Sequence, residues 1–222
     1  MGWVDVAVLL SFVAYGVASG LWSRKRASRN LEEYFLAGRS LSGWTAGLSM
    51  AATQFAADTP LLVTGLVATA GIFALWQLWI YALAFLLLGF VLAPSWRRAR
   101  VITDAEITEL RYGSRAALWL RVIKAVYFGT LFNCIVLAWV LFATRAVAEP
   151  ILVWDQWLPG GLFAHLQALV SWVGVPLAVD PHGPELWVRS TNNAISLLAV
   201  AVVTLFYSTT GGLRTVVRTD VL

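Results

Sequence analysis

The chain has 222 residues, of which 59% are hydrophobic and only 13% are charged, and its mean hydropathy is +0.75. Because soluble domains carry about 25% charged residues, this composition excludes an ordinary soluble domain and indicates an integral membrane protein. The formal net charge is +4, but the basic residues lie between apolar runs, which argues against nucleic acid as a partner. Cys134 is the single cysteine, so neither a disulfide framework nor a cysteine metal site is expected.

Five apolar stretches are long enough to be predicted as membrane spans, since a helix needs about 20 apolar residues to cross a bilayer. They lie near residues 3–22, 43–69, 71–94, 116–144 and 193–210. The first stretch is followed, not preceded, by the basic cluster that begins at Arg24, so it is predicted to be a retained span and not a cleaved signal peptide. Two glycine pairs, Gly16 with Gly20 and Gly43 with Gly47, permit close helix packing.

The basic residues predict the orientation, because cytoplasmic flanks collect Lys and Arg. Of the 16 basic residues, all but Arg145 and Arg189 fall on or near one side of the predicted spans. That majority side is expected to be cytoplasmic, which places the amino terminus outside. The protein is therefore predicted to be a multi-pass protein of the inner (plasma) membrane.

The segment at about residues 146–190 is predicted to be external and to lie at the membrane interface. Its apolar part, 162–179, approaches the length of a span, but it contains His165, Gly174 and Pro176. Counting it as a sixth span would also move Arg214 and Arg218 to the outside. Several tryptophans lie in or beside this segment, and indole rings prefer the interface.

Between the third and fourth spans, Thr103 and Glu106 have the spacing of a capping box, in which each side chain satisfies a backbone N–H near the helix start. We expect a short cytoplasmic helix to begin there. It should end at Tyr112-Gly113, because glycine tolerates the left-handed conformation that closes many helices.

Asp58 is the most informative residue of the sequence, because it lies within the second span, where a carboxylate costs about 2.5–3.5 kcal/mol on insertion scales. Pro60 follows two residues later, removes a backbone donor and clashes with the carbonyl four residues before it. We therefore expect the helix to break or kink here, as in transporters that bind ions and solutes at midplane breaks. The alternative is a proline-kinked helix in which Asp58 only bonds to a neighbouring helix.

Three sequence blocks resemble the sodium/solute symporter family, which includes sodium-coupled sugar and proline transporters. The first begins at Glu33 with Glu-Tyr-Phe-Leu-Ala-Gly-Arg-Ser-Leu, the second is Thr103-x-x-Glu-x-x-Glu-x-Arg-Tyr-Gly, and the third is Tyr207-x-x-x-Gly-Gly-Leu with Thr219-Asp220. The resemblance implies an all-α integral membrane protein with a leucine-transporter-like fold. It also implies that this fold is incomplete here, with one extra amino-terminal helix and core helices one to four, ending where the next helix should begin.

The resemblance also implies site residues. Backbone carbonyls of Ala52 and Phe55 correspond to the first-helix ligands of sodium, while the remaining family ligands lie on a later helix. Asp58 and Thr59 correspond to solute-contacting positions, and Gln77 lies close to another. With Gln54, these are the candidate solute-binding residues.

The expected function is sodium-coupled secondary active transport of a small organic solute by alternating access, with sodium, the solute and the lipid bilayer as partners. An alternative is the symporter-like sensing domain of a membrane histidine kinase. A membrane enzyme that uses Asp58 as an acid or base is not expected, because no membrane-embedded His or Cys partner is visible. The solute, the sodium stoichiometry and the oligomeric state stay open.

Overall fold

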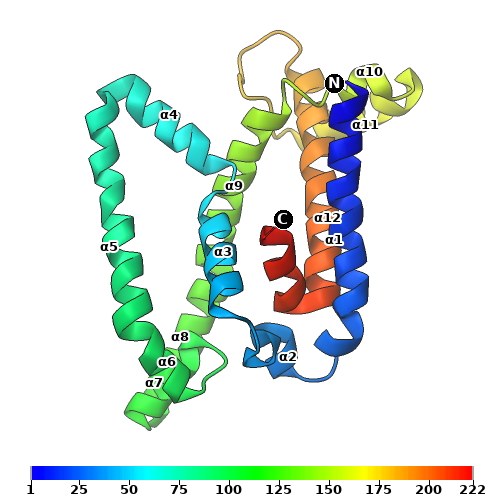
Figure 1. The fold of residues 1–222 in the computed structure, drawn as a ribbon. Helices are drawn as coiled ribbons and strands as arrows, with labels where there is room; N and C mark the ends of the chain where they lie inside the picture. The colour runs from blue at the N-terminus through cyan, green and yellow to red at the C-terminus, as the bar shows by residue number, and fades with distance from the viewer. Residues whose placement is uncertain (1, 222) are drawn as a thin grey trace. The chain divides into compact units, whose positions relative to one another are not determined.

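The computed structural model describes residues 2–221, which form helices in two units (Figure 1). The first unit consists of the residues up to Asp58 together with those from Val140 onward, and the second is Thr59–Trp139. Each unit is described by itself.

Four helices of the described chain are long and apolar enough to cross a membrane. They agree with the first, third, fourth and fifth predicted spans. Two of them are single elements, α1 (Trp3–Ala27) and α12 (Leu186–Asp220). The helix at Ile72–Ala99 is composed of η2 (Ile72–Leu78), α5 (Trp79–Leu87), the π-helical η3 (Leu88–Leu92) and α6 (Ala93–Ala99). The helix at Arg115–Ala148 is composed of α8 (Arg115–Val126), the π-helical η4 (Tyr127–Phe132) and α9 (Asn133–Ala148).

The second predicted span is interrupted, as the proline in it predicted. Helix α3 (Gly43–Gln54) has 12 residues and α4 (Asp58–Ala70) has 13, and residues 55–57 between them are not helical. Pro60 has no N–H to donate to the carbonyl of Ala56, so a continuous helix would lack a hydrogen bond here. The same proline is tolerated in the first turn of α4, where backbone N–H groups have no intrahelical partner.

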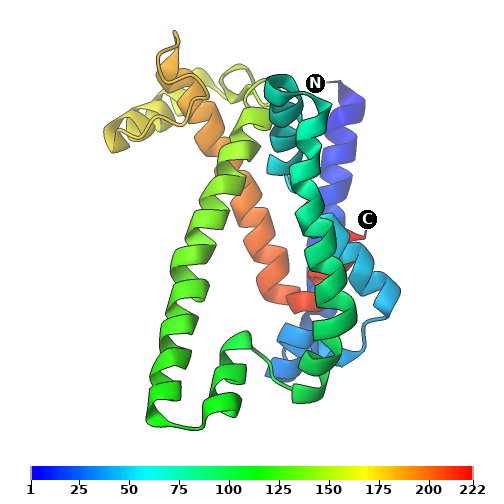
Figure 2. The same ribbon diagram turned by 90° about the vertical axis from the view of Figure 1, so that its left-hand side faces the viewer.

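The first unit is built around α1 and α12, which run side by side in the same direction (Figure 1, Figure 2). Small residues allow the close approach: a Cβ added to Gly20 would lie 3.1 Å from the Cα of Tyr207 and 2.8 Å from Oγ1 of Thr210. The Oγ1 of Thr215 donates to the carbonyl of Ser19 at 3.3 Å. The prediction from the first glycine pair is confirmed. For the second pair, a Cβ on Gly43 or Gly47 would meet no heavy atom within 4 Å in the described chain.

Helix α12 bends sharply at Gly212, whose φ of 59° and ψ of −164° are outside the helical region. This backbone conformation is essentially restricted to glycine, because a Cβ would clash with the chain. A Cβ here would also lie 2.7 Å from the carbonyl oxygen of Tyr34. The bend therefore packs against the short helices that follow α1, namely α2 (Leu31–Leu36) and the 3₁₀ turn η1 (Ala37–Arg39).

In the second unit, the predicted short helix is present as α7, Asp104–Tyr112, and it ends at Gly113 with a φ of 53°. The predicted capping box is wrong in detail. The Thr103 side chain makes no capping hydrogen bond, and the Glu106 carboxylate accepts from the backbone N–H of Ile102 at 3.0 Å, one residue earlier than expected. The carboxylate thus satisfies a free N–H beside the helix start without help from the threonine.

Ion pairs hold α7 against α8 within the second unit. Arg121 binds the carboxylates of Glu109 and Glu106, and the ammonium group of Lys124 lies 2.9 Å from the carboxylate of Asp104. All of these side chains are partly exposed, so each pair contributes about 0–1 kcal/mol. The acidic residues of α7 thus pair with basic residues of α8.

The segment between α9 and α12 forms two short helices, α10 (Trp154–Trp157) and α11 (Gly160–Val173), at the start of α12 (Figure 2). The indole N–H of Trp154 donates to Ser196 at 2.8 Å, and the hydroxyl of Ser190 accepts from the backbone N–H groups of Leu177 and Ala178. Helix α11 has 14 residues, fewer than the roughly 20 that a span requires. Its predicted location at the membrane interface stays a prediction.

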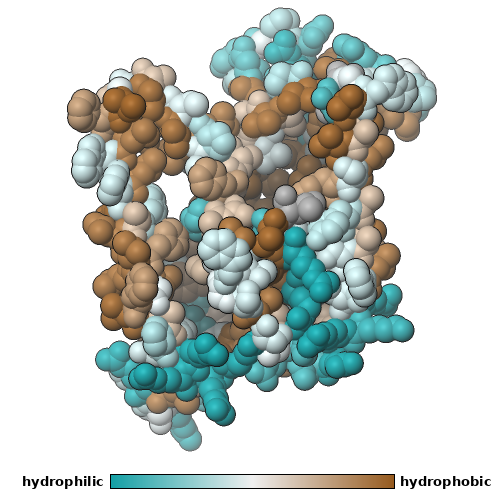
Figure 3. All heavy atoms as spheres, in the orientation of Figure 1, coloured by the Kyte–Doolittle hydropathy of each residue, from teal (hydrophilic) through white to brown (hydrophobic). Residues whose placement is uncertain are grey.

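The surface of the first unit follows this arrangement. Figure 3 shows a hydrophobic and neutral zone along α1 between a hydrophilic zone over α2 and another over the segment that contains α10 and α11. Alternation of this kind is expected where apolar helices end in polar flanks at both sides of a bilayer.

Candidate functional site

The candidate site is the interruption between α3 and α4. Ser42 caps the start of helix α3, and its hydroxyl accepts from the backbone N–H of Thr45 at 3.1 Å. Phe55 follows the last helical residue, and its N–H donates to the carbonyl of Ala52 at 2.9 Å. That last bond spans three residues, so the final turn is tightened. A carbonyl oxygen has two lone pairs, so the Ala52 oxygen keeps one for another donor or for a cation.

The ends of the two helices carry opposite partial charges at the interruption. The carboxyl end of α3 presents carbonyls and favours a cation, whereas the amino end of α4 favours an anion. Asp58 is the first residue of α4, and its carboxylate is therefore stabilised by that helix end. This placement lowers the free-energy cost of keeping the Asp58 carboxylate charged within the apolar segment. It is compatible both with a ligand-binding Asp58 and with an Asp58 that only has a structural role in a proline-kinked helix.

A contact from the end of α12 fixes the position of α3. The hydroxyl of Ser49 donates to the carboxylate of Asp220 at 2.5 Å, and the hydroxyl of Thr53 donates to the Ser49 carbonyl at 2.9 Å. Ser49 is buried. Because a hydrogen bond to a charged group is worth about 1.5–3 kcal/mol, this contact orients the helix that carries the expected sodium carbonyls.

A second contact fixes the chain that leads into α3. Arg214 follows the bend of α12. Its guanidinium donates to the carbonyl of Ala37 at 2.6 Å and to the hydroxyl of Ser40 at 2.9 Å. The same group lies 3.3 Å from the carboxylate of Glu33. The hydroxyl of Tyr34 donates to the carbonyl of Thr209 at 3.2 Å. We call this set of contacts the α2–α12 joint.

The α2–α12 joint brings together two sequence blocks that lie 175 residues apart. Both blocks are recognisable in the sequence, but the contact between them is not predicted from it. The two glycines at Gly211 and Gly212 were the available signal, because adjacent glycines after an apolar helix indicate a bend with a close backbone neighbour.

The structure groups only part of the predicted site. Ala52, Gln54, Phe55 and Asp58 lie together on the first unit at the end of α3 and the start of α4. Thr59 is next in sequence but opens the second unit, which also carries Gln77 within η2. The grouping of Gln77 with Asp58, and the roles of all six residues, stay predictions.

Charged residues of the first unit are separated between the two ends of α12, as the sorting of basic residues predicted. At the bent end, Arg26 lies 3.5 Å from Glu33, and Arg218 donates to Ser23 at 3.4 Å. At the opposite end, Arg145 donates to the carbonyl of Leu177, and Arg189 pairs with Glu149. The two basic residues assigned to the minority side thus lie together, away from the majority.

Comparisons with known proteins identify relatives of this chain. The profile of the sodium:solute symporter family matches residues 34–149. A sodium/glucose cotransporter of Vibrio parahaemolyticus is 27% identical over 100% of this chain, and sodium/glucose cotransporter 4 of Homo sapiens is 28% identical over 79% of it. A sodium/mannose cotransporter of Bos taurus is 30% identical over 65% of the chain.

The chain spans 34% of the Vibrio relative and 25–26% of the two vertebrate relatives. No solved structure gives a significant match. The relatives are transporters and not enzymes, and the apolar helices agree with a multi-pass membrane protein.

Proposed function

This chain belongs to the sodium:solute symporter family, and from that premise we propose that the complete protein couples inward sodium movement to the uptake of a small organic solute by alternating access. The proposed location is the inner (plasma) membrane with the amino terminus outside. The separation of basic residues in the first unit supports this orientation, because Lys and Arg collect on cytoplasmic flanks.

The observation that carries the proposal is the interruption of an apolar segment directly before Asp58. Non-helical backbone at membrane depth is tolerated only where it is covered by protein or lines an aqueous cavity, because unsatisfied N–H and C=O groups cost several kcal/mol each in lipid. A break of this kind provides carbonyls for an ion and helix ends for a polar solute.

Within this proposal, the carbonyls of Ala52 and Phe55 provide part of the sodium site. Oxygen ligands suit a hard cation such as sodium, and these carbonyls lie at the negative end of α3. The Ser49–Asp220 contact holds that end in place.

The side chains of Gln54, Asp58, Thr59 and Gln77 are proposed to bind the solute. Carboxylate, amide and hydroxyl groups can each bond the hydroxyl groups of a sugar. Because relatives carry the names of glucose and mannose cotransporters, these two sugars are the first solutes to test.

The test uses the complete protein in proteoliposomes with an inward sodium gradient and radiolabelled glucose or mannose. We expect uptake that is stimulated by sodium and falls to the background level when choline replaces sodium. Uptake that is unchanged in choline and independent of a proton gradient would contradict the proposal.

The Asp58→Asn variant tests the role of the carboxylate while keeping its size. Loss of one charge-assisted hydrogen bond, worth about 1.5–3 kcal/mol, should raise the half-saturating solute concentration at least about tenfold. Asp180→Asn is the matched control, because Asp180 is exposed in the loop before α12. Equal transport parameters for both variants would assign Asp58 to helix packing.

A further inference from the structure

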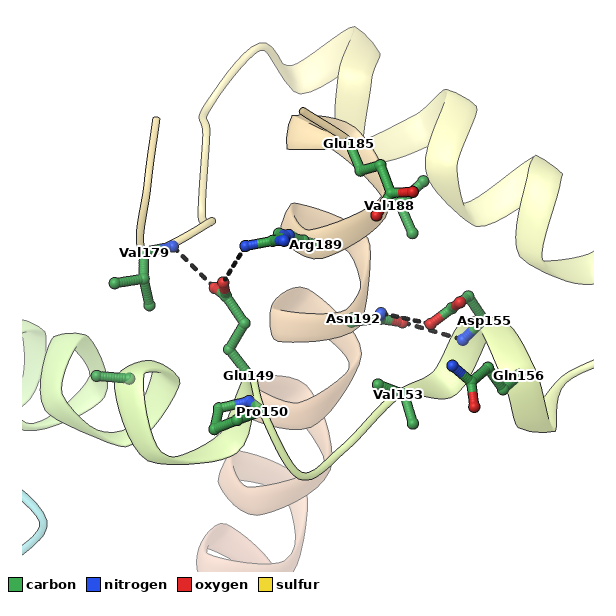
Figure 4. A pocket seen from close by; sticks show the side chains of 11 residues that line it. Glu149, Pro150, Val153, Asp155, Gln156, Val179, Glu185, Val188, Arg189 and Asn192 are labelled. Atoms are coloured by element: carbon green, nitrogen blue, oxygen red, sulfur yellow. Dashed lines mark hydrogen bonds and ion pairs between the residues drawn. The ribbon is translucent and has the colours of Figure 1, made fainter. Parts of the chain in front are cut away.

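A cavity of about 480 Å³ lies in the first unit where the end of α9, helix α10 and the start of α12 meet (Figure 4). Its volume is within the range of about 300–1,000 Å³ that is typical of small-molecule sites. It lies at the end of α12 opposite the α2–α12 joint, and none of its lining residues belongs to the candidate transport site.

The charges of the lining are not balanced. The cavity is lined by three carboxylates, those of Glu149, Asp155 and Glu185, and by one guanidinium, that of Arg189. Arg189 lies 3.6 Å from Glu149, which neutralises one carboxylate. The remaining two carboxylates leave the lining with a net charge of about −2 when both are ionised.

Hydrogen bonds hold the carboxylate of Glu149 and make that wall rigid. Glu149 accepts from the backbone N–H of Val179 at 2.8 Å and from the amide of Asn193 at 2.6 Å. Asn193 is completely buried, and among the described residues its Oδ1 has no hydrogen-bond partner. Asn193 does not line the cavity, so its amide positions the Glu149 carboxylate from behind the wall, where Arg145 donates to the same Leu177 carbonyl that accepts from Asn193.

Asp155 is held by a reciprocal pair of hydrogen bonds that leaves its charge intact. The side-chain amide of Asn192 donates to the Asp155 carboxylate at 2.7 Å, and the backbone N–H of Asp155 donates to Oδ1 of Asn192 at 3.1 Å (Figure 4). Because the partner is a neutral amide, the carboxylate is positioned but not neutralised. Glu185, the residue before α12, adds the second uncompensated carboxylate from an exposed position.

Apolar side chains complete the lining. Pro150, Val153, Val179 and Val188 surround the polar groups. A metal ion would need three or more ligating side chains close together, and the described residues contain no such group of His, Cys, Asp or Glu. The lining therefore combines an uncompensated negative charge with apolar surface.

We propose that this cavity binds a small organic cation, a protonated amine or guanidine on an apolar skeleton. The cationic group contacts Asp155 and Glu185, and the skeleton contacts the valines and the proline. Both carboxylates gain a charged partner. Burial of the apolar part of the ligand contributes about 25 cal/mol per Å² of surface removed from water. This site is separate from the proposed transport function.

The experiment measures binding of benzylammonium to the complete protein in detergent by isothermal titration calorimetry. Benzylammonium should bind in a saturable manner with one site per chain, and benzyl alcohol, an uncharged analogue of similar shape, should bind at least tenfold more weakly. The Glu185→Gln variant should weaken benzylammonium binding several-fold and should leave the Asp155–Asn192 pair intact. Val188→Trp keeps every charge and fills the cavity, and it should abolish binding.

Asp5→Asn is the matched control, because Asp5 is near the start of α1 and does not line the cavity. It should bind benzylammonium as the unchanged protein does. Asp58→Asn should also bind it normally, because Asp58 does not line this cavity, so a failure of the transport proposal would not affect this result. Thermal unfolding of each variant checks that it is folded. Equal binding of benzyl alcohol, or unchanged binding by folded Glu185→Gln and Val188→Trp variants, would overturn the proposal.

Discussion

The contact between α1 and α12 predicts that two identical substitutions four residues apart have opposite effects. A Cβ on Gly20 would lie 2.8 Å from Oγ1 of Thr210 and 3.1 Å from the Cα of Tyr207. The threonine can rotate, but the Cα is backbone, so the two helices must separate by a few tenths of an ångström. Overpacking of this kind lowers the free energy of unfolding by about 1–3 kcal/mol, whereas the helix preference of alanine over glycine raises it by about 0.5–1 kcal/mol. The difference lies between about 0 and 2.5 kcal/mol, so Gly20→Ala should destabilise the protein by about 1 kcal/mol.

Gly16→Ala is the matched control, since it makes the same change on the same face of α1. A Cβ on Gly16 would lie 3.5 Å from the ring of Tyr207 and 3.9 Å from Thr219, which are ordinary van der Waals distances. This variant should be as stable as the unchanged protein or slightly more stable. Thermal unfolding of the complete protein in one detergent compares the two. Equal midpoints for both variants, or a lower midpoint for Gly16→Ala, would refute the packing argument.

Two further predictions concern the α2–α12 joint. Gly212→Ala should lower the free energy of unfolding by about 2 kcal/mol or more, because its conformation is nearly restricted to glycine and its Cβ would contact the Tyr34 carbonyl. Gly161→Ala in α11, where an added Cβ meets no heavy atom within 4 Å, should have little effect, and thermal unfolding compares the two variants. Arg214→Lys should make the chain around Ala37 more sensitive to limited proteolysis, because an ammonium cannot reproduce the several directed guanidinium contacts. An unchanged cleavage pattern of the protein in detergent would contradict this.

The sequence predicts well those features that depend on neighbours in the chain. The interruption of the second span follows from Pro60, which removes a specific backbone bond, and the end of α7 follows from Gly113, which adopts the expected left-handed conformation. The capping box at Thr103 was wrong because more than one nearby N–H can satisfy the Glu106 carboxylate, and the sequence does not decide which.

Contacts between distant segments could not be predicted in the same way. Nothing near Tyr34 indicates that its backbone lies against Gly212, and nothing near Asp155 indicates that Asn192 orients its carboxylate. These contacts depend on how whole helices are packed, which hydrophobic periodicity does not specify. The two sequence blocks that form the α2–α12 joint can each be recognised in the sequence, but their contact cannot. No sequence motif indicates the cavity beside α10.

The accessibility of the interruption before Asp58 tests most directly whether this part of the chain lines a water-filled site. A Phe55→Cys variant of the complete protein, with Cys134 replaced by serine and other accessible cysteines removed, is treated with a membrane-impermeant methanethiosulfonate reagent with and without sodium. We expect rapid labelling without sodium and slower labelling with it, because the carbonyls of residues 52 and 55 would then face an ion in a water-filled pocket. A thiol that stays unreactive in both conditions, as expected for a residue facing lipid, would contradict it.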